Sequence, residues 1–225
     1  MSALGTRIHS ITSENVVKYR NEYASLRDPD GRYASFDYCF NYFRRFTTEK
    51  GHRPDAPEHL QLSTLHLGYY LASWGMLRNS FLRTLSSRAL TSTVRAISDV
   101  PRSVWNLDVD DYGDNKAVNQ ILATKEEIIK ALKPNVPTGT LVTKIMLGVF
   151  GNVTAFDQFF RVGTGLNRLN EASIASIHSF YQKFKDEIRE GRRPTLDFSS
   201  GQPTSYIYTN AKVIDMIFFM RRNRE

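Results

Sequence analysis

The chain has 225 residues, of which 41% are hydrophobic, 24% charged and 12% aromatic. Frequent aromatic residues and charges of both signs exclude a wholly disordered chain, and the single cysteine, Cys39, excludes a disulfide scaffold and a cysteine-based zinc site. The formal net charge of +7 favours an anionic partner without saying which one.

Helical spacing of apolar residues dominates the N-terminal half of the chain. Ser13 and Ser35 are good N-caps, and the Asp28–Gly31 stretch is typical of a turn. The residues around Glu49–Pro57 predict a loop, because two prolines and a glycine fall there. The helices expected in this half cover residues 13–26, 35–46, 57–84 and 86–99.

The C-terminal half has the same character, with an acidic loop at 108–114 and a stiff, proline-containing turn at 133–140. Helices are expected at 115–133, 141–150, 174–188 and 206–220, with a break at Gly151, a short segment over 153–162 and a loop over 191–203. The prediction is an all-α, compact multi-helix globule forming a single helical domain over 1–225. Two lobes, about 1–110 and 111–225 with a cleft between them, are the alternative.

The beginning of the chain is polar up to Ser13 and lacks the apolar run of a secretion signal. No window reaches the roughly 18 uninterrupted apolar residues of a membrane span. We therefore expect a cytoplasmic protein that does not enter a membrane. The sequence leaves the oligomeric state open, with a monomer as the simplest expectation.

Several common catalytic signatures are missing from the chain. It contains no G-x-x-x-x-G-K-[ST] phosphate loop, no G-x-G-x-x-G, no H-E-x-x-H and no G-x-S-x-G. The five histidines are scattered and no acidic residues complete a ligand set around them. We therefore expect no metal and no cofactor.

The most informative stretch is Pro137–Val162. A glycine-containing turn leads into an apolar helix whose exposed N–H groups could hold a phosphate, and Lys144 lies in the first two turns of that helix. After the break at Gly151, one carboxylate, Asp157, stands in an apolar and aromatic frame. It is either the N-cap of a following helix or a working carboxylate, and the two roles are compatible.

This stretch resembles the helix-hairpin-helix DNA glycosylases. The shared features are a glycine-containing hairpin, Thr143-Lys144, the phrase Val149-Phe150-Gly151 and the run Ala155-Phe-Asp-Gln-Phe-Phe-Arg-Val162. The resemblance implies a helical fold, DNA as partner and a catalytic role for Asp157. The chain departs from the family at Pro137–Thr140, where Pro-Gly-Val-Gly is usual. The separation of Lys144 and Asp157 is also shorter than in members that use a lysine nucleophile, which favours a monofunctional enzyme.

A second resemblance rests on Ala72–Met76 with Arg78, and on Thr143–Gly148 with Phe150-Gly151. These phrases are similar to a family of uncharacterised bacterial proteins. Some relatives of that kind look similar to phage-defence glycosylases that excise glucosylated hydroxymethylcytosine. This resemblance implies a specialisation in antiviral defence.

A glycosylase of this type would extrude its target nucleotide from the duplex, because the glycosidic bond is inaccessible inside the stack. Asp157 would stabilise the oxocarbenium character of the sugar and could orient or deprotonate the attacking water. The candidates for holding the flanking phosphates are Thr138, Gly139, Thr140, Lys144 and Arg161.

Two segments could form the pocket for the extruded base. Asp37 and Tyr38 place an acid beside aromatic rings, and the acid could read a base amino group. Trp74 and Arg78 would share a helix face at i,i+4, with Asn79 beside Arg78. Both segments also fit a structural interpretation, in which the aromatic residues are core and Asp37 is a cap.

Three other functions remain open. A non-catalytic helical nucleic-acid-binding module explains the positive charge without a reaction at Asp157. A structural or interaction protein is also compatible with the pattern. A ribonuclease toxin of the higher-eukaryote-and-prokaryote nucleotide-binding type is the least favoured, because the prolines between Arg53 and His59 disfavour a regular helix through that motif.

Overall fold

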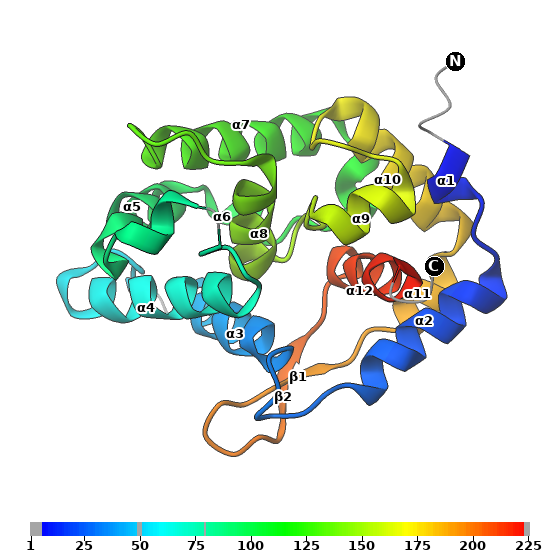
Figure 1. Cartoon of the computed structure of the whole chain (residues 1–225), viewed down its shortest axis with the longest axis horizontal. Coiled ribbons are helices and arrows are strands. Elements are labelled where there is room, and N and C mark those ends of the chain that lie inside the picture. The colour runs from blue at the N-terminus through cyan, green and yellow to red at the C-terminus, as the bar shows by residue number, and fades with distance from the viewer. Residues whose placement is uncertain (1–5, 49–50, 79, 223–225) are drawn as a thin grey trace.

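The structure is a computed structural model that describes residues 6–48, 51–78 and 80–222 (Figure 1). The described chain is mostly helical, with one small two-stranded sheet, so the predicted all-α fold class is confirmed. No helix among these residues is long and apolar enough to cross a membrane.

The helices form two packed groups that lie left and right in Figure 1. The left group contains α3 (Ala34–Thr48), α4 (Pro57–Ser73), α5 (Thr91–Asp99), α6 (Arg102–Trp105), α7 (Asn115–Ala131) and α8 (Gly139–Phe150). The right group contains α1 (Thr6–His9), α2 (Ser13–Ser25), α9 (Gln158–Thr164), α10 (Glu171–Lys183), α11 (Lys185–Glu190) and α12 (Asn210–Arg222). Short 3-10 turns also occur: η2 (Phe81–Thr84), η3 (Ser87–Leu90) and η4 (Val109–Gly113).

The two groups do not follow the division near residue 110 that the sequence suggested. On the right, α12 packs along α2 and α9, and α1 packs on α9. On the left, α8 packs against α3, α4 and α7. The chain therefore starts in the right group, builds the left one and returns after α8. The turn η4 contacts α7, α10 and α12 and so joins the groups.

Local signals set most helix ends. Pro57 opens α4, as expected for proline in a first turn. Asp114, Asn170 and Asp157 cap α7, α10 and α9 through their side chains. The cap of α2 is Thr12 and not the predicted Ser13, since the Thr12 hydroxyl accepts a hydrogen bond from the amide of Asn15.

The longest predicted helix is too long by about three turns. The helix α4 ends at Ser73 with Trp74 as its C-cap, because Gly75 adopts a left-handed conformation with φ of 75°. The helix expected over 86–99 is likewise shorter: the turn η3 precedes α5.

The loop expected over 191–203 contains a hairpin instead. Strands β1 (Pro194–Leu196) and β2 (Pro203–Ile207) pair antiparallel, with Pro194 opposite Ile207 and Leu196 opposite Pro203. The last helix, α12, consequently begins at Asn210 and not at Tyr206. The helix expected over 174–188 divides into α10 and α11 at Phe184, whose backbone leaves the helical region.

Candidate active site

The helices α7 and α8 form a hairpin whose turn leads to the exposed start of α8. The Thr138 hydroxyl accepts a hydrogen bond from the amide of Leu141 at 3.2 Å and caps the helix. Thr138 and Gly139 are exposed, and a β-carbon at Gly139 would meet open space. The rest of α8 is buried from Leu141 to Phe150 and ends at Gly151, whose φ of 68° suits glycine.

The segment between α8 and α9, residues 151–157, is irregular and almost wholly buried. A buried segment without secondary structure needs partners for its backbone groups. Two threonines of α8 are the partners of Phe156, near the end of this segment. Thr143 Oγ1 accepts a hydrogen bond from the Phe156 amide at 2.9 Å, and Thr140 Oγ1 donates one to the Phe156 carbonyl at 2.8 Å. These contacts fix the backbone immediately before Asp157.

Asp157 lies at the N-terminus of α9 and uses both carboxylate oxygens. Its Oδ1 accepts from the amide of Phe160 at 3.0 Å, so the predicted N-cap role is confirmed. Its Oδ2 lies 2.7 Å from Lys144 Nζ. The Asp157 side chain is 15% exposed and that of Lys144 only 3%. The carboxylate is therefore held in one place, in a side chain that is not fully buried.

Aromatic side chains adjoin this ion pair. The Lys144 ammonium lies 4.5 Å from the ring centroid of Trp74. Trp74 also belongs to an aromatic triad, Tyr33, Trp74 and Phe219, whose ring centroids lie 5.7 to 5.8 Å apart. The guanidinium of Arg32 lies 5.1 Å from the Tyr33 ring and 5.6 Å from that of Trp74. The indole N–H of Trp74 is buried and has no hydrogen-bond partner among the described residues.

The predicted base-pocket residues Asp37 and Tyr38 lie elsewhere. Asp37 is fully buried, where its carboxylate accepts from Tyr208 Oη at 2.7 Å and from the Leu196 amide at 2.8 Å. Burial raises the pKa of Asp37. Asp37 links α3 to β1 through its bond to the Leu196 amide. The predicted role of Asp37, a hydrogen bond to a base amino group, does not fit this placement. Tyr38 lines a groove of about 610 Å³ that Arg32 and Ser73 also line.

Trp74 and Arg78 do not share a helix face, because α4 ends before both of them. Arg78 is exposed and lines a groove of about 280 Å³ together with Thr138 and Thr140. Arg78 therefore lies beside the hairpin residues expected to hold phosphates rather than in a base pocket with Trp74. Asn79 lies outside the described residues.

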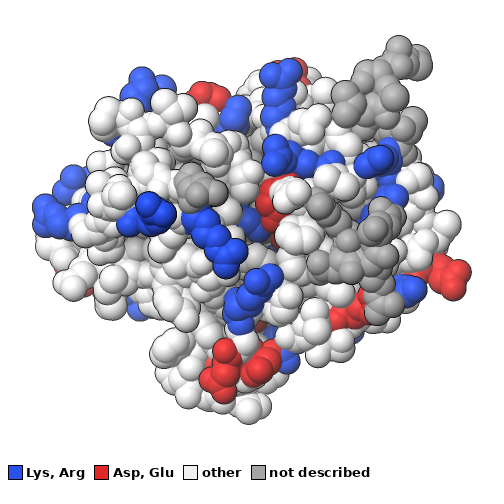
Figure 2. Space-filling view, in the orientation of Figure 1, with Lys and Arg blue, Asp and Glu red and all other residues white. Residues whose placement is uncertain are grey.

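Among the predicted DNA contacts, Arg161 is exposed on α9, one helical turn after Asp157. Lys144 differs from the expectation, because its side chain is buried and its ammonium is paired with Asp157. A phosphate contact through Lys144 therefore does not fit this structure. Figure 2 shows Lys and Arg side chains spread over the middle of this face, with an acidic patch in a hollow between them. Other acidic side chains gather near the strands and along α2.

The sequence did not point to Arg32, Tyr33 or Phe219. Tyr33 precedes α3, and Phe219 lies on α12 near the end of the chain. No motif or spacing joins these residues to Trp74, because they lie far from it in the sequence and meet it only through tertiary packing. The aromatic spacing within α3 drew attention to Tyr38 instead.

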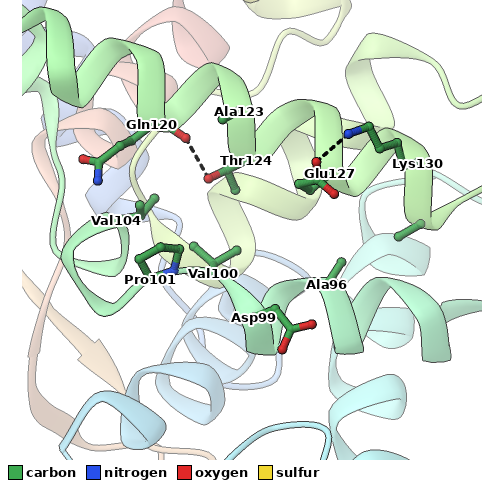
Figure 3. A pocket seen from close by; sticks show the side chains of 11 residues that line it. Ala96, Asp99, Val100, Pro101, Val104, Gln120, Ala123, Thr124, Glu127 and Lys130 are labelled. Carbon is green, nitrogen blue, oxygen red and sulfur yellow. Dashed lines mark hydrogen bonds and ion pairs between the residues drawn. The ribbon is translucent and has the colours of Figure 1, made fainter.

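A hollow between α5 and α7 lies apart from these residues (Figure 3). It has a volume of about 500 Å³, and small and apolar side chains make up much of its wall. Two of its polar groups are satisfied within α7: Lys130 Nζ pairs with Glu127 at 2.6 Å, and the Thr124 hydroxyl donates to the Gln120 carbonyl at 2.8 Å. It contains none of the residues predicted to act on a substrate.

Metal-ligating side chains do not cluster within the part of the chain that the structure describes: no group of three His, Cys, Asp or Glu residues could hold an ion. Comparison with known proteins adds no family, since no family model matches the chain and no curated protein or solved structure matches it. The site is therefore interpreted from its own geometry.

Proposed function

We propose that the protein is a DNA glycosylase that hydrolyses the N-glycosidic bond of a modified or damaged base, with Asp157 as its catalytic carboxylate. The observation that carries this proposal is the setting of Asp157. Its carboxylate is fixed by the Phe160 amide and by Lys144, yet 15% of the side chain is exposed. Its partner Lys144 contacts Trp74 of the aromatic triad, and the exposed start of α8 precedes it in the chain.

A fixed carboxylate in a partly exposed side chain suits the chemistry of glycosidic bond cleavage. As the bond between sugar and base stretches, the sugar gains oxocarbenium character. The Asp157 carboxylate stabilises that positive charge and orients the water that attacks the sugar carbon. Because neighbouring groups already hold the carboxylate, little reorganisation is needed when the charge develops.

Lys144 serves in this mechanism as the partner of Asp157 and not as a nucleophile. A lysine that attacks the sugar must present a free amine to it. The Lys144 ammonium is instead buried between the Asp157 carboxylate and the Trp74 ring. This arrangement favours hydrolysis by water, which leaves an abasic site without cutting the strand.

The DNA backbone is held by the exposed groups around the hairpin. Thr138 and Gly139 offer the N–H groups at the start of α8, a favourable place for a phosphate. Arg78 shares a groove with Thr138, and Arg161 is exposed on α9. Contacts of this kind position the duplex without reading its sequence.

Tyr33 and Trp74 of the aromatic triad are partly exposed, and Arg32 lies over both rings. An extruded base that displaces the Arg32 guanidinium can stack there for about 1–3 kcal/mol. We place the substrate among modified bases, and phage DNA that carries glucosylated hydroxymethylcytosine is the first to test. A role in antiviral defence in the cytoplasm goes with that substrate.

The test compares the wild type with Asp157→Asn and with Asp186→Asn. The second variant is a matched control, because it removes the same charge from an exposed position on α11. Each protein is incubated with glucosylated phage DNA and with deaminated and alkylated DNA, and strand breaks are counted after alkali. DNA affinity is measured at several salt concentrations.

Asp157→Asn is expected to lower base release by at least about 100-fold while DNA affinity stays close to that of the wild type. Asp186→Asn is expected to leave both unchanged. Base release that survives Asp157→Asn ends the assignment of this residue. Salt-dependent binding without base release by the wild type supports the non-catalytic binding module instead.

A further inference from the structure

A second buried ion pair lies on α12. Lys212 Nζ and Asp215 Oδ2 are 3.4 Å apart, and the two side chains are 1% and 9% exposed. The ammonium lies 4.5 Å from the ring centroid of Phe36, 5.2 Å from that of Tyr23 and 5.5 Å from that of Trp74. It therefore shares the Trp74 ring with Lys144.

The other oxygen of Asp215 reaches the segment that carries Asp157. Asp215 Oδ1 accepts a hydrogen bond from the amide of Ala155 at 3.0 Å. Ala155 is fully buried, so this amide needs a protein partner. A hydrogen bond to a carboxylate is shorter and stronger than one between neutral groups. Helix α12 thus anchors the segment two residues before Asp157.

The segment is fixed from two sides at this point. Asp215 holds Ala155 from the right group of helices, while Thr143 and Thr140 of α8 hold Phe156 from the left group. The position of the Asp157 carboxylate is therefore set by both groups at once. An error of about 1 Å in the position of a catalytic group can cost about 100-fold in rate.

A buried ion pair is an inefficient way to gain stability, because the cost of removing both charges from water offsets much of their attraction. Retaining one at this place needs another reason. Asp215 provides the acceptor that Ala155 requires, and Lys212 neutralises the carboxylate that provides it. The aromatic rings around Lys212 stabilise its ammonium in turn.

We infer that Asp215 is a positioning residue for the reaction at Asp157 and that Lys212 is the counter-ion that permits its burial. This inference rests on the proposed function. It goes further by assigning part of the catalytic geometry to the last helix, far from the stretch that resembles known glycosylases. Neither residue contacts the substrate in this account.

Two double variants separate the acceptor from the charges. Lys212→Met with Asp215→Asn removes both charges and keeps an oxygen that can accept from the Ala155 amide. Lys212→Met with Asp215→Leu removes both charges and the acceptor at similar volume. Single-turnover base release, DNA affinity, thermal midpoint and hydrogen exchange of the Ala155 amide are measured for both. If the leucine variant does not fold, Asp215→Ala in the same background removes the acceptor without adding apolar bulk.

The asparagine variant is expected to release base within about 5-fold of the wild-type rate. The leucine variant is expected to be about 10- to 100-fold slower at saturating enzyme, with unchanged DNA affinity and with faster exchange of the Ala155 amide. Equal rates in the two variants, or equal exchange of Ala155, overturn the inference even if Asp157 is catalytic. A wild type that releases no base overturns the proposed function, and the exchange of Ala155 then decides alone whether Asp215 holds the segment.

Discussion

Replacing Asp157 with asparagine removes the charge that partners Lys144 but keeps an oxygen that can cap α9. Asparagine and aspartate are about equally good N-caps, so the cap itself costs little. The main effect falls on Lys144, whose side chain is 3% exposed and whose ammonium loses its partner at 2.7 Å. Removing one member of a buried pair typically costs about 3–5 kcal/mol.

Two features of the structure place the expected cost toward the lower end of that range. The Asp157 side chain is 15% exposed, so the pair is already partly solvated. The Trp74 ring lies 4.5 Å from the ammonium and continues to attract it. We therefore expect Asp157→Asn to lower the free energy of unfolding by about 3–4 kcal/mol.

The reciprocal variant, Lys144→Met, leaves a carboxylate whose side chain is partly exposed and which still accepts from the Phe160 amide. Its expected cost is about 1–2 kcal/mol. The double variant carries neither charge, so it should be more stable than the sum of the single effects predicts, by about 1–3 kcal/mol.

Urea unfolding of the wild type, both single variants and the double variant measures this coupling. Additive effects, with a coupling near zero, would refute the claim that the two charges form a buried pair. The double variant has a second use. It should remain inactive in base release even though its stability partly recovers, which separates the chemistry of Asp157 from its contribution to folding.

Three further predictions concern residues outside the pair. Burial raises the pKa of Asp37 from 3.8, so the folded protein holds this proton more tightly than the unfolded chain and loses stability as the pH rises above about 4. Asp37→Asn lacks this group, so its thermal midpoint minus that of the wild type should increase as the pH rises. A difference between the two midpoints that stays constant from pH 4 to 7 contradicts this. Cys39 is 1% exposed, and burial raises its pKa. A thiol reagent should therefore label it only after unfolding. Rapid labelling of the native protein would contradict this prediction. A β-carbon at Gly148 would overlap the ring of Tyr70. Gly148→Ala should therefore destabilise the protein by about 1–3 kcal/mol in urea titrations, despite the better helix propensity of alanine. An equally stable variant would show that the ring can move aside.

Local features of the fold could be predicted from the sequence because their causes are local. Pro57 starts a helix, Gly151 ends one, and Asp157 caps the next. Each depends on one residue and a few neighbours. The role of Asp157 as a cap follows from this local order.

Other features depend on residues far apart in the chain and could not be predicted in this way. The apolar pattern continues beyond Ser73, but Gly75 takes a left-handed conformation and ends α4, which separates Trp74 from Arg78. The strands around Leu196 are short, and β1 is held by Asp37, a contact across most of the chain. The contact of Asp215 with Ala155 likewise exists only because α12 packs beside the segment.

The central claim is that this chain releases a base from DNA by hydrolysis. Mass spectrometry of small molecules released from glucosylated phage DNA, deaminated DNA and alkylated DNA tests it most directly. The wild type is expected to release a free base from at least one of these substrates and to leave abasic sites that break only after alkali. No free base from any of them, or strand breaks that form without alkali, would contradict hydrolysis at Asp157.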